Sequence, residues 1–131
     1  KQILKGGVEM KKPTILVIED FQGVRKTIEY VLENDYEIIE AETAAQGLEM
    51  IKNDKPDMVI IDHKIPGGMS GLDVVQLLKR KHNPIPVIMM SAFDIEDKAR
   101  QSGVKAFLSK PCNVFDLKEI IKKYLVKKKE I

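Results

Sequence analysis

Short apolar runs alternate with helix-like segments from Pro13 onward, and this alternation is the strongest constraint on the fold. The runs are four to six residues long and rich in β-branched side chains, which is typical of strands buried on both faces of a parallel sheet. The predicted strands are 14–18, 36–40, 58–61, 87–90 and 104–109, and the predicted helices are 22–33, 44–53, 72–81, 94–101 and 114–124. This pattern indicates an α/β domain of five βα units.

The size and composition of the chain favour one globular domain. Its 131 residues can build one hydrophobic core, and 44% of them are hydrophobic while 32% are charged. No apolar stretch approaches the ~20 residues that span a bilayer, so we expect no membrane segment. The single cysteine cannot form an internal disulfide, which favours a cytoplasmic location. We divide the chain into an N-terminal extension (1–12), a domain (13–126) and a basic C-terminal tail (127–131).

The net charge of +2 is unevenly distributed along the chain. Residues 1–12 sum to +3 and residues 122–131 sum to +4, which leaves −5 for the residues between them. Lysine-rich ends can contact nucleic acid, but a solvated helix end is the more common explanation. Because no aromatic residues are interleaved with the lysines, we expect no direct nucleic-acid binding by this domain.

Polar residues follow the predicted strands at the point where each strand ends. Glu19 and Asp20 follow the first strand, Asp62 the third, Ser91 the fourth and Lys110 the fifth. In a flavodoxin-like sheet of strand order 2-1-3-4-5, the first and third strands are neighbours and ligands bind outside the carboxyl ends. Crowded carboxylates favour a bound cation, and oxygen ligands select Mg²⁺ or Ca²⁺. Since phosphate readily completes a Mg²⁺ shell, the sequence predicts a phosphate-handling magnesium site.

Four short motifs stand in order along the predicted domain. They are Ile15–Asp20, Pro56–Asp62 with Pro66 and Gly71, Ser91–Ala92, and Lys110–Pro111. Together they resemble the receiver domain of two-component response regulators over essentially all of residues 13–126. The resemblance implies the flavodoxin-like (βα)5 fold and a cis Lys110–Pro111 bond. It also implies a signalling protein, not an enzyme, that receives a phosphoryl group from a histidine kinase or phosphotransfer protein.

The resemblance assigns a role to each residue of the predicted site. Asp62 would be the phosphoacceptor, and Lys110 would neutralise charge on the transferring phosphoryl group. Mg²⁺ would be held by Glu19, Asp20, Asp62 and the backbone carbonyl of Lys64. Glu19 stands where Asp is more frequent in the family, which lengthens the reach to the metal ion.

Further residues would change state once the phosphoryl group is in place. Ser91 would hydrogen-bond a phosphoryl oxygen, and Phe107 would rotate inward as Ser91 moves, although ordinary core packing is the alternative for Phe107. The changed surface would be formed by helix 94–101, strand 104–109 and helix 114–124, and it would bind a downstream protein or effector domain.

Two positions near Asp62 and Ser91 suggest how long the phosphoryl group would remain on Asp62. Lys64 lies two residues after Asp62, and Phe93 lies two residues after Ser91. In the receiver family these positions govern access of water to the acyl phosphate, so a lysine and a bulky aromatic predict slow self-dephosphorylation, over minutes or longer. His63 should point away from Asp62 as a packing or rim residue.

Other functions fit the sequence less well. A haloacid-dehalogenase-like phosphatase also uses a strand-end Asp and Mg²⁺, but it needs a second Asp where this chain has Lys64, together with a cap domain. A flavodoxin needs a Ser/Thr-rich phosphate loop after the first strand, which is absent. We therefore expect either a stand-alone receiver, as a monomer or phosphorylation-dependent dimer, or the receiver of a longer regulator with a DNA-binding or enzymatic domain.

Overall fold

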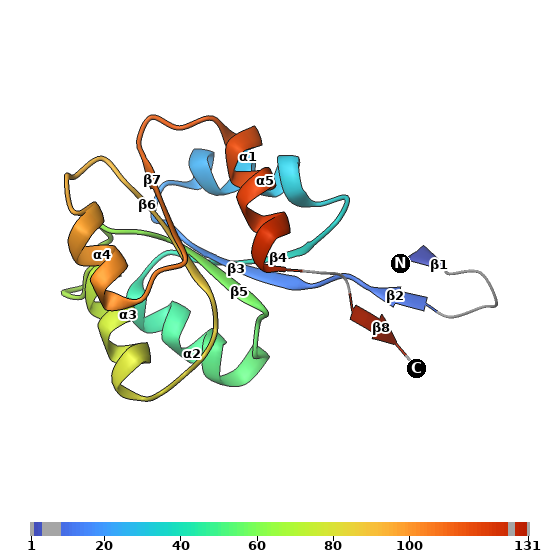
Figure 1. Cartoon of the computed structure of the whole chain (residues 1–131), viewed down its shortest axis with the longest axis horizontal. Coiled ribbons are helices and arrows are strands. Elements are labelled where there is room, and N and C mark those ends of the chain that lie inside the picture. The colour runs from blue at the N-terminus through green and yellow to red at the C-terminus, as the bar shows by residue number, and fades with distance from the viewer. Residues whose placement is uncertain (1, 4–8, 126–127, 131) are drawn as a thin grey trace.

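The computed structural model, which describes residues 2–3, 9–125 and 128–130, places a five-stranded parallel sheet between two layers of helices (Figure 1). The strands are β3 (Thr14–Ile18), β4 (Glu37–Ala41), β5 (Met58–Asp62), β6 (Val87–Ser91) and β7 (Ala106–Ser109). Their spatial order is β4-β3-β5-β6-β7. Counted within this sheet, that order is 2-1-3-4-5, so the predicted flavodoxin-like topology is confirmed.

Five helices alternate with these strands, and several of their ends are capped by side chains or by glycine. The helices are α1 (Gln22–Leu32), α2 (Ala44–Asp54), α3 (Gly71–Arg80), α4 (Glu96–Ser102) and α5 (Val114–Tyr124). The Thr43 side chain accepts a hydrogen bond from the Gln46 N–H, and the Asn113 side chain accepts one from the Phe115 N–H, as N-caps do. Gly103 ends α4 with a φ of +109°. None of the described helices is long and apolar enough to cross a membrane.

Each strand serves two separate cores because consecutive side chains point to opposite faces of the sheet. Ile15 and Val17 pack in the core under α1 and α5, whereas Leu16 and Ile18 pack in the core under α2, α3 and α4. All four side chains are fully buried. Burial on both faces explains why the strands are continuous apolar runs in the sequence.

The last predicted strand is shorter than expected. The predicted range was 104–109, but β7 begins at Ala106. The N–H of Val104 donates to the carbonyl of Ala99, 3.3 Å away, and so belongs to the end of α4. The helix itself is displaced by one or two residues from the predicted 94–101.

A second, antiparallel sheet was not predicted. It is formed by β1 (Gln2–Ile3), β2 (Glu9–Lys11) and β8 (Lys128–Glu130), with Glu9 opposite Glu130 and Lys11 opposite Lys128. The interpretation of the last lysines as a solvated helix end is therefore wrong for Lys128 and Lys129, because α5 ends at Tyr124. These segments lack the apolar alternation by which a strand is recognised. The domain boundary drawn at 126–127 lies outside the described residues.

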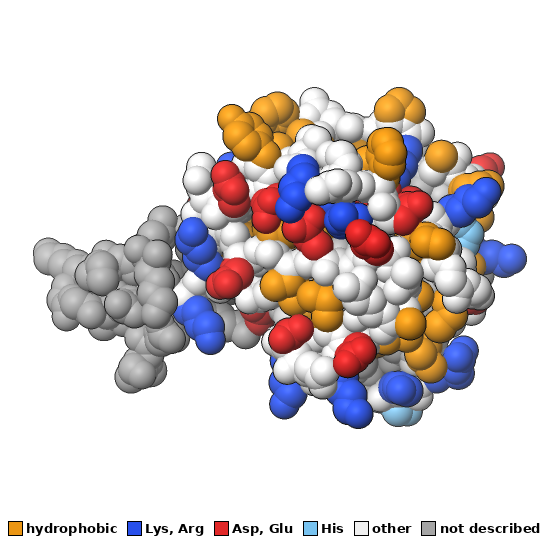
Figure 2. All heavy atoms as spheres, turned by 180° about the vertical axis from the view of Figure 1, so that it is seen from behind, with side chains coloured by type: hydrophobic (Ala, Val, Ile, Leu, Met, Phe, Trp, Pro, Cys, Tyr) orange, Lys and Arg blue, Asp and Glu red, His pale blue; other side chains and the backbone are white. Residues whose placement is uncertain are grey.

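Charges of both signs share the surface of the domain. On the face shown in Figure 2, acidic side chains gather near the middle with basic ones among them, and further basic side chains lie along the lower edge. Charged side chains of the domain also form ion pairs. For example, Lys26 Nζ lies 3.0 Å from Glu40 and 3.3 Å from Glu29. The face in Figure 2 is therefore mixed in charge and carries no continuous basic stripe.

Candidate phosphoryl-acceptor site

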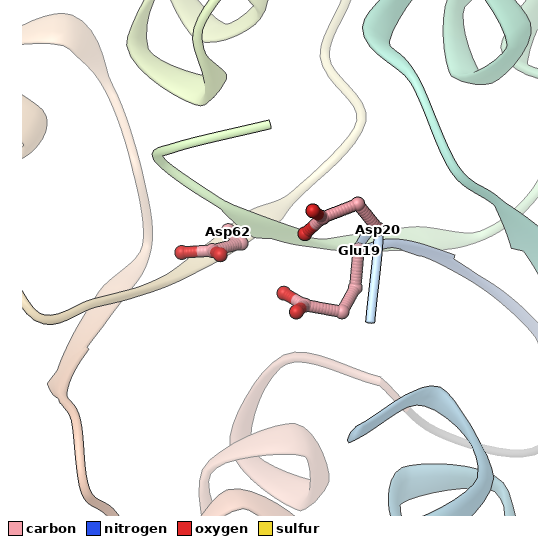
Figure 3. A group of neighbouring side chains, drawn as sticks. All are labelled: Glu19, Asp20 and Asp62. Atoms are coloured by element: carbon pink, nitrogen blue, oxygen red, sulfur yellow. The ribbon is translucent and has the colours of Figure 1, made fainter. Parts of the chain in front are cut away.

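Three carboxylates gather at the carboxyl ends of two neighbouring strands (Figure 3). Glu19 and Asp20 directly follow β3, and Asp62 is the last residue of β5. One oxygen of each carboxylate lies within 4.8 Å of the others. Glu19 is only 4% exposed, whereas Asp20 is open to solvent. The structure thus brings together the three acidic residues that the sequence placed at this edge.

Lys110 supplies the positive charge at this edge of the sheet. Its Nζ lies 3.2 Å from Asp62 Oδ2 and 3.4 Å from Glu19 Oε2. Burial alone lowers the pKa of the ammonium, but attraction to Asp62 and Glu19 outweighs it and raises the pKa above its ordinary value. Lys110 therefore stays protonated. The Lys110–Pro111 peptide bond is cis, as predicted.

The surroundings of Glu19 disfavour the ionised form of its carboxylate. Burial, followed by the negative charge of Asp62, raises the pKa of Glu19 from 4.5 to about 7, against the opposing attraction of Lys110. When all three carboxylates are ionised, they and the Lys110 ammonium together carry a net charge of −2, so Lys110 alone does not neutralise the cluster. Carboxylate oxygens are the ligands that Mg²⁺ prefers, so the donor set fits a divalent cation of this type.

Ser91 lies beside this cluster at the end of β6 and is fully buried. Its Oγ accepts a hydrogen bond from the N–H of Phe93 at 2.9 Å, and its carbonyl accepts one from the N–H of Lys110 at 2.8 Å. Ser91 thus links the loop after β6 to the loop after β7. Phe107 is buried in the core under α2, α3 and α4, and its predicted role in switching stays a prediction.

The two flanking residues chosen from the sequence contact one another. Lys64 Nζ lies 5.8 Å from the ring centroid of Phe93, within the range of a cation–π interaction. The ring of His63 packs against the same phenyl ring in a T-shaped arrangement, with an angle of 75° between the two planes. The sequence indicated Lys64 and Phe93 separately, but it gave no sign that they meet or that His63 joins them.

The loop after β5 returns to the site at Gly71, the first residue of α3. The N–H of Gly71 donates to the carbonyl of His63 at 2.6 Å. A Cβ added at Gly71 would collide with the backbone carbonyl of Asp62 and the Cα of His63. Gly71 belongs to one of the motifs found in the sequence, and this close backbone approach is the reason that glycine is needed there.

Arg25 is a site residue that the sequence analysis missed. It is 7% exposed, and its Nη1 donates to the backbone carbonyls of Glu19 and Asp20 at 2.8 and 3.1 Å. Its other nitrogens pair with Glu40 at 3.1 Å and Glu42 at 3.4 Å. Arg25 therefore fixes the backbone of the acidic pair to the end of β4. A charged residue within the buried stripe of a helix is the one sequence signal that could have revealed it.

An apolar groove of about 580 Å³ adjoins the site on the side of α1. Phe21, Val24 and Ile28 line one wall, and Pro111 and Val114 line the other. Lys110 reaches into the same lining, so the groove opens directly beside the carboxylates. The ring of Phe21 at its rim is 68% exposed.

Comparison with known proteins identifies the family. The model of the response regulator receiver domain matches residues 15–122. The chain belongs to the response regulator receiver family. Receivers of this family generally act as phosphoacceptors and typically hold Mg²⁺ in an acidic pocket such as the one formed by Glu19, Asp20 and Asp62.

Individual relatives of this receiver differ in length. It is 29% identical to sporulation initiation phosphotransferase F of Bacillus subtilis over 120 residues, covering 88% of this chain and 96% of that protein. It is 35% identical over 113 residues to the phosphate regulon transcriptional regulatory protein PhoB of Klebsiella pneumoniae, covering 82% of this chain but 48% of that protein. A receiver domain protein of Clostridium thermocellum superimposes with a TM-score of 0.77 at 30% identity, covering 86% of this chain and 93% of that one.

Proposed function

We propose that this receiver accepts a phosphoryl group on Asp62 from the phosphohistidine of a histidine kinase or phosphotransfer protein. The supporting observation is that Lys110 Nζ lies 3.2 Å from Asp62, within a cluster of three carboxylates. A positioned carboxylate nucleophile, an ammonium and a cation-holding acidic pair are the groups that this transfer requires.

In the proposed step, a carboxylate oxygen of Asp62 attacks the phosphorus atom. The O–P bond forms as the P–N bond breaks, and the imidazole nitrogen of the donor keeps the electron pair, so nothing is oxidised or reduced. Lys110 neutralises charge on the phosphoryl oxygens as they approach. The protein is thus a phosphoacceptor that at most catalyses its own phosphorylation and dephosphorylation.

The other site residues support this chemistry without forming bonds to phosphorus. Glu19, Asp20 and Asp62, with the carbonyl of Lys64, are the groups that would hold Mg²⁺, which when bound adds positive charge beside the phosphoryl oxygens. The hydroxyl of Ser91 would donate to a phosphoryl oxygen once the acyl phosphate has formed. That change would reach the downstream partner or effector domain through Phe107 and the surface of α4, β7 and α5.

The groove beside the site supports a helical phosphoryl donor as the partner. Its apolar walls and the exposed ring of Phe21 suit the side chains of a helix, which would bring its phosphohistidine over Asp62. We assign the protein to the cytoplasm, where such donors meet their receivers.

The direct test is phosphorylation by a small donor, because it needs no knowledge of the kinase. The wild type incubated with acetyl phosphate and Mg²⁺ is expected to gain the mass of one phosphoryl group, and Asp62→Asn is expected to gain none. Intact-mass spectrometry measures both. Asp57→Asn is a matched control that should still be phosphorylated, since Asp57 lies at the opposite end of β5. A mass gain in Asp62→Asn, or none in the wild type, would contradict the proposal.

The lifetime of the acyl phosphate is a separate expectation. We expect the wild type to lose its phosphoryl group over minutes or longer after the donor is removed, because we infer that Lys64 and Phe93, whose Nζ atom and ring centroid lie 5.8 Å apart, hinder the approach of water to the acyl phosphate. Intact mass followed over time gives the rate. Loss within seconds in the absence of a phosphatase would show that these side chains do not shield the site.

A further inference from the structure

The ring of Phe93 bridges the two loops that flank Asp62. Its backbone N–H is tied to Ser91 Oγ at 2.9 Å, while its ring, 48% exposed, reaches the loop after β5. There it meets two consecutive residues, with Lys64 Nζ 5.8 Å from the ring centroid and the His63 ring centroid also at 5.8 Å. The backbone of Phe93 is thus held by Ser91, and its phenyl ring is contacted by Lys64 and His63.

The contact with His63 has a defined geometry. The two rings stand at 75° to each other in an edge-to-face arrangement, which aromatic pairs favour. The backbone of His63 is fixed on both sides, because its N–H donates to the Met90 carbonyl at 3.3 Å and its carbonyl accepts from Gly71 at 2.6 Å. Of the two partners of the phenyl ring, His63 is therefore the anchored one, whereas Lys64 is an exposed, flexible side chain.

The buried Nδ1 atom of the histidine ring is surrounded by packing and not by a hydrogen-bond partner. Its Nδ1 is the one buried side-chain nitrogen or oxygen without a hydrogen-bond partner in the part of the chain that the structure describes. Burying such an atom unpaired costs free energy, so a favourable contact must offset the cost. The edge of the ring against Phe93 is a contact that can do so.

We propose that His63 is a positioning residue that holds the Phe93 ring between the two loops beside Asp62. This inference rests on the proposed function, because the effect of the held ring is to slow the attack of water on the acyl phosphate. In this role His63 acts through Phe93, and not on the phosphoryl group or on the carboxylates that would hold the metal ion. In hydrolysis a water oxygen bonds to phosphorus and its proton passes to solvent, while the bond from phosphorus to the Asp62 oxygen breaks and the carboxylate leaves with the electron pair. His63 determines how often the path for that water is open.

A double-mutant cycle on the decay rate tests this role. His63→Leu is expected to speed loss of the phosphoryl group about two- to tenfold, the factor that matches the usual strength of an edge-to-face pair. In the Phe93→Ala background the same substitution is expected to add nothing, because its target is gone. His63→Phe, which restores an aromatic edge, should return the rate toward that of the wild type. His82→Leu, at the other and exposed histidine, is the matched control.

A second measurement on unphosphorylated protein separates this inference from the proposed function. The chain has two histidines, so His82→Leu leaves the ring protons of His63 as the only imidazole signals in a proton NMR spectrum. Phe93→Ala in that background should shift them by removing the phenyl ring current. Should His63→Leu fail to fold, Phe93→Leu removes the same aromatic contact from the exposed side.

The outcomes are distinct. Unshifted His63 signals in Phe93→Ala, unchanged decay in His63→Leu, or additive effects in the cycle would each overturn the role of His63 while leaving phosphorylation of Asp62 standing. A wild type that takes up no phosphoryl group would overturn the proposed function, and the lifetime effect with it, even if the ring contact is present.

Discussion

Arg25→Met is expected to lower the free energy of unfolding by about 3 kcal/mol, because it leaves buried acceptors without their donor. Two backbone carbonyls, of Glu19 and Asp20, lose hydrogen bonds of 2.8 and 3.1 Å. Glu40, itself only 23% exposed, loses its buried partner as well. Since those carbonyls belong to the acidic pair, we also expect Mg²⁺ to bind about tenfold more weakly. Urea denaturation and titration calorimetry measure the two effects.

The next residue along the helix provides a control for Arg25. Lys26 contacts the same Glu40 at 3.0 Å, but its side chain is 52% exposed. Because an exposed ion pair contributes little net free energy, Lys26→Met should leave both the free energy of unfolding and the Mg²⁺ affinity nearly unchanged. If both methionine variants lost the same stability, or if Arg25→Met bound Mg²⁺ as the wild type does, Arg25 would not be the anchor of the acidic loop.

Without a divalent cation, Glu19 is expected to make the folded protein less stable as the pH rises. The pKa of Glu19 is raised from 4.5 to about 7, so the folded state holds this proton more tightly than the unfolded chain does. The contribution to stability is complete below about 4.5 and is lost as the pH rises through about 7. The shift corresponds to about 3 kcal/mol. Denaturation in EDTA across this range measures it.

Glu19→Gln isolates this effect from the other titrating groups. The glutamine cannot ionise, so the difference in unfolding free energy between the variant and the wild type should grow in favour of the variant from pH 4.5 to beyond pH 7. In saturating Mg²⁺ the advantage should shrink, because a cation favours the ionised carboxylate of the wild type. A difference that stays constant with pH in EDTA would show that Glu19 ionises normally.

The five-stranded sheet and its edge could be predicted because a local pattern encodes each part of them. Runs such as 58–61 are apolar on both faces, and the chain places its polar residues at strand ends, where topology collects them. Caps such as Thr43 and Asn113 follow from side-chain chemistry within one turn of the helix. These features can be predicted because they depend only on residues that are close in sequence or on the general topology of parallel sheets.

The features that were missed depend on contacts between distant segments. Periodicity counts apolar residues, so it passes over Arg25, whose burial is tolerated only because Glu40 and two carbonyls meet it there. The contact of His63 with Phe93 joins two loops whose side-chain directions the sequence does not specify. The pairing of β2 with β8 couples polar segments from the two ends of the chain.

The absence of a side chain at Gly71 separates two kinds of position in the loop after β5. Residues 66–70 connect fixed points: Gly67 and Gly68 turn there with φ values of +104° and +88°, which other residues adopt only with strain, and Ser70 caps α3. At Gly71 a single added methyl group would press on the carbonyl of Asp62 and displace the backbone of that residue. A substitution in the middle of this loop therefore strains the loop locally, whereas one at Gly71 also alters the position of Asp62 at the carboxyl end of β5.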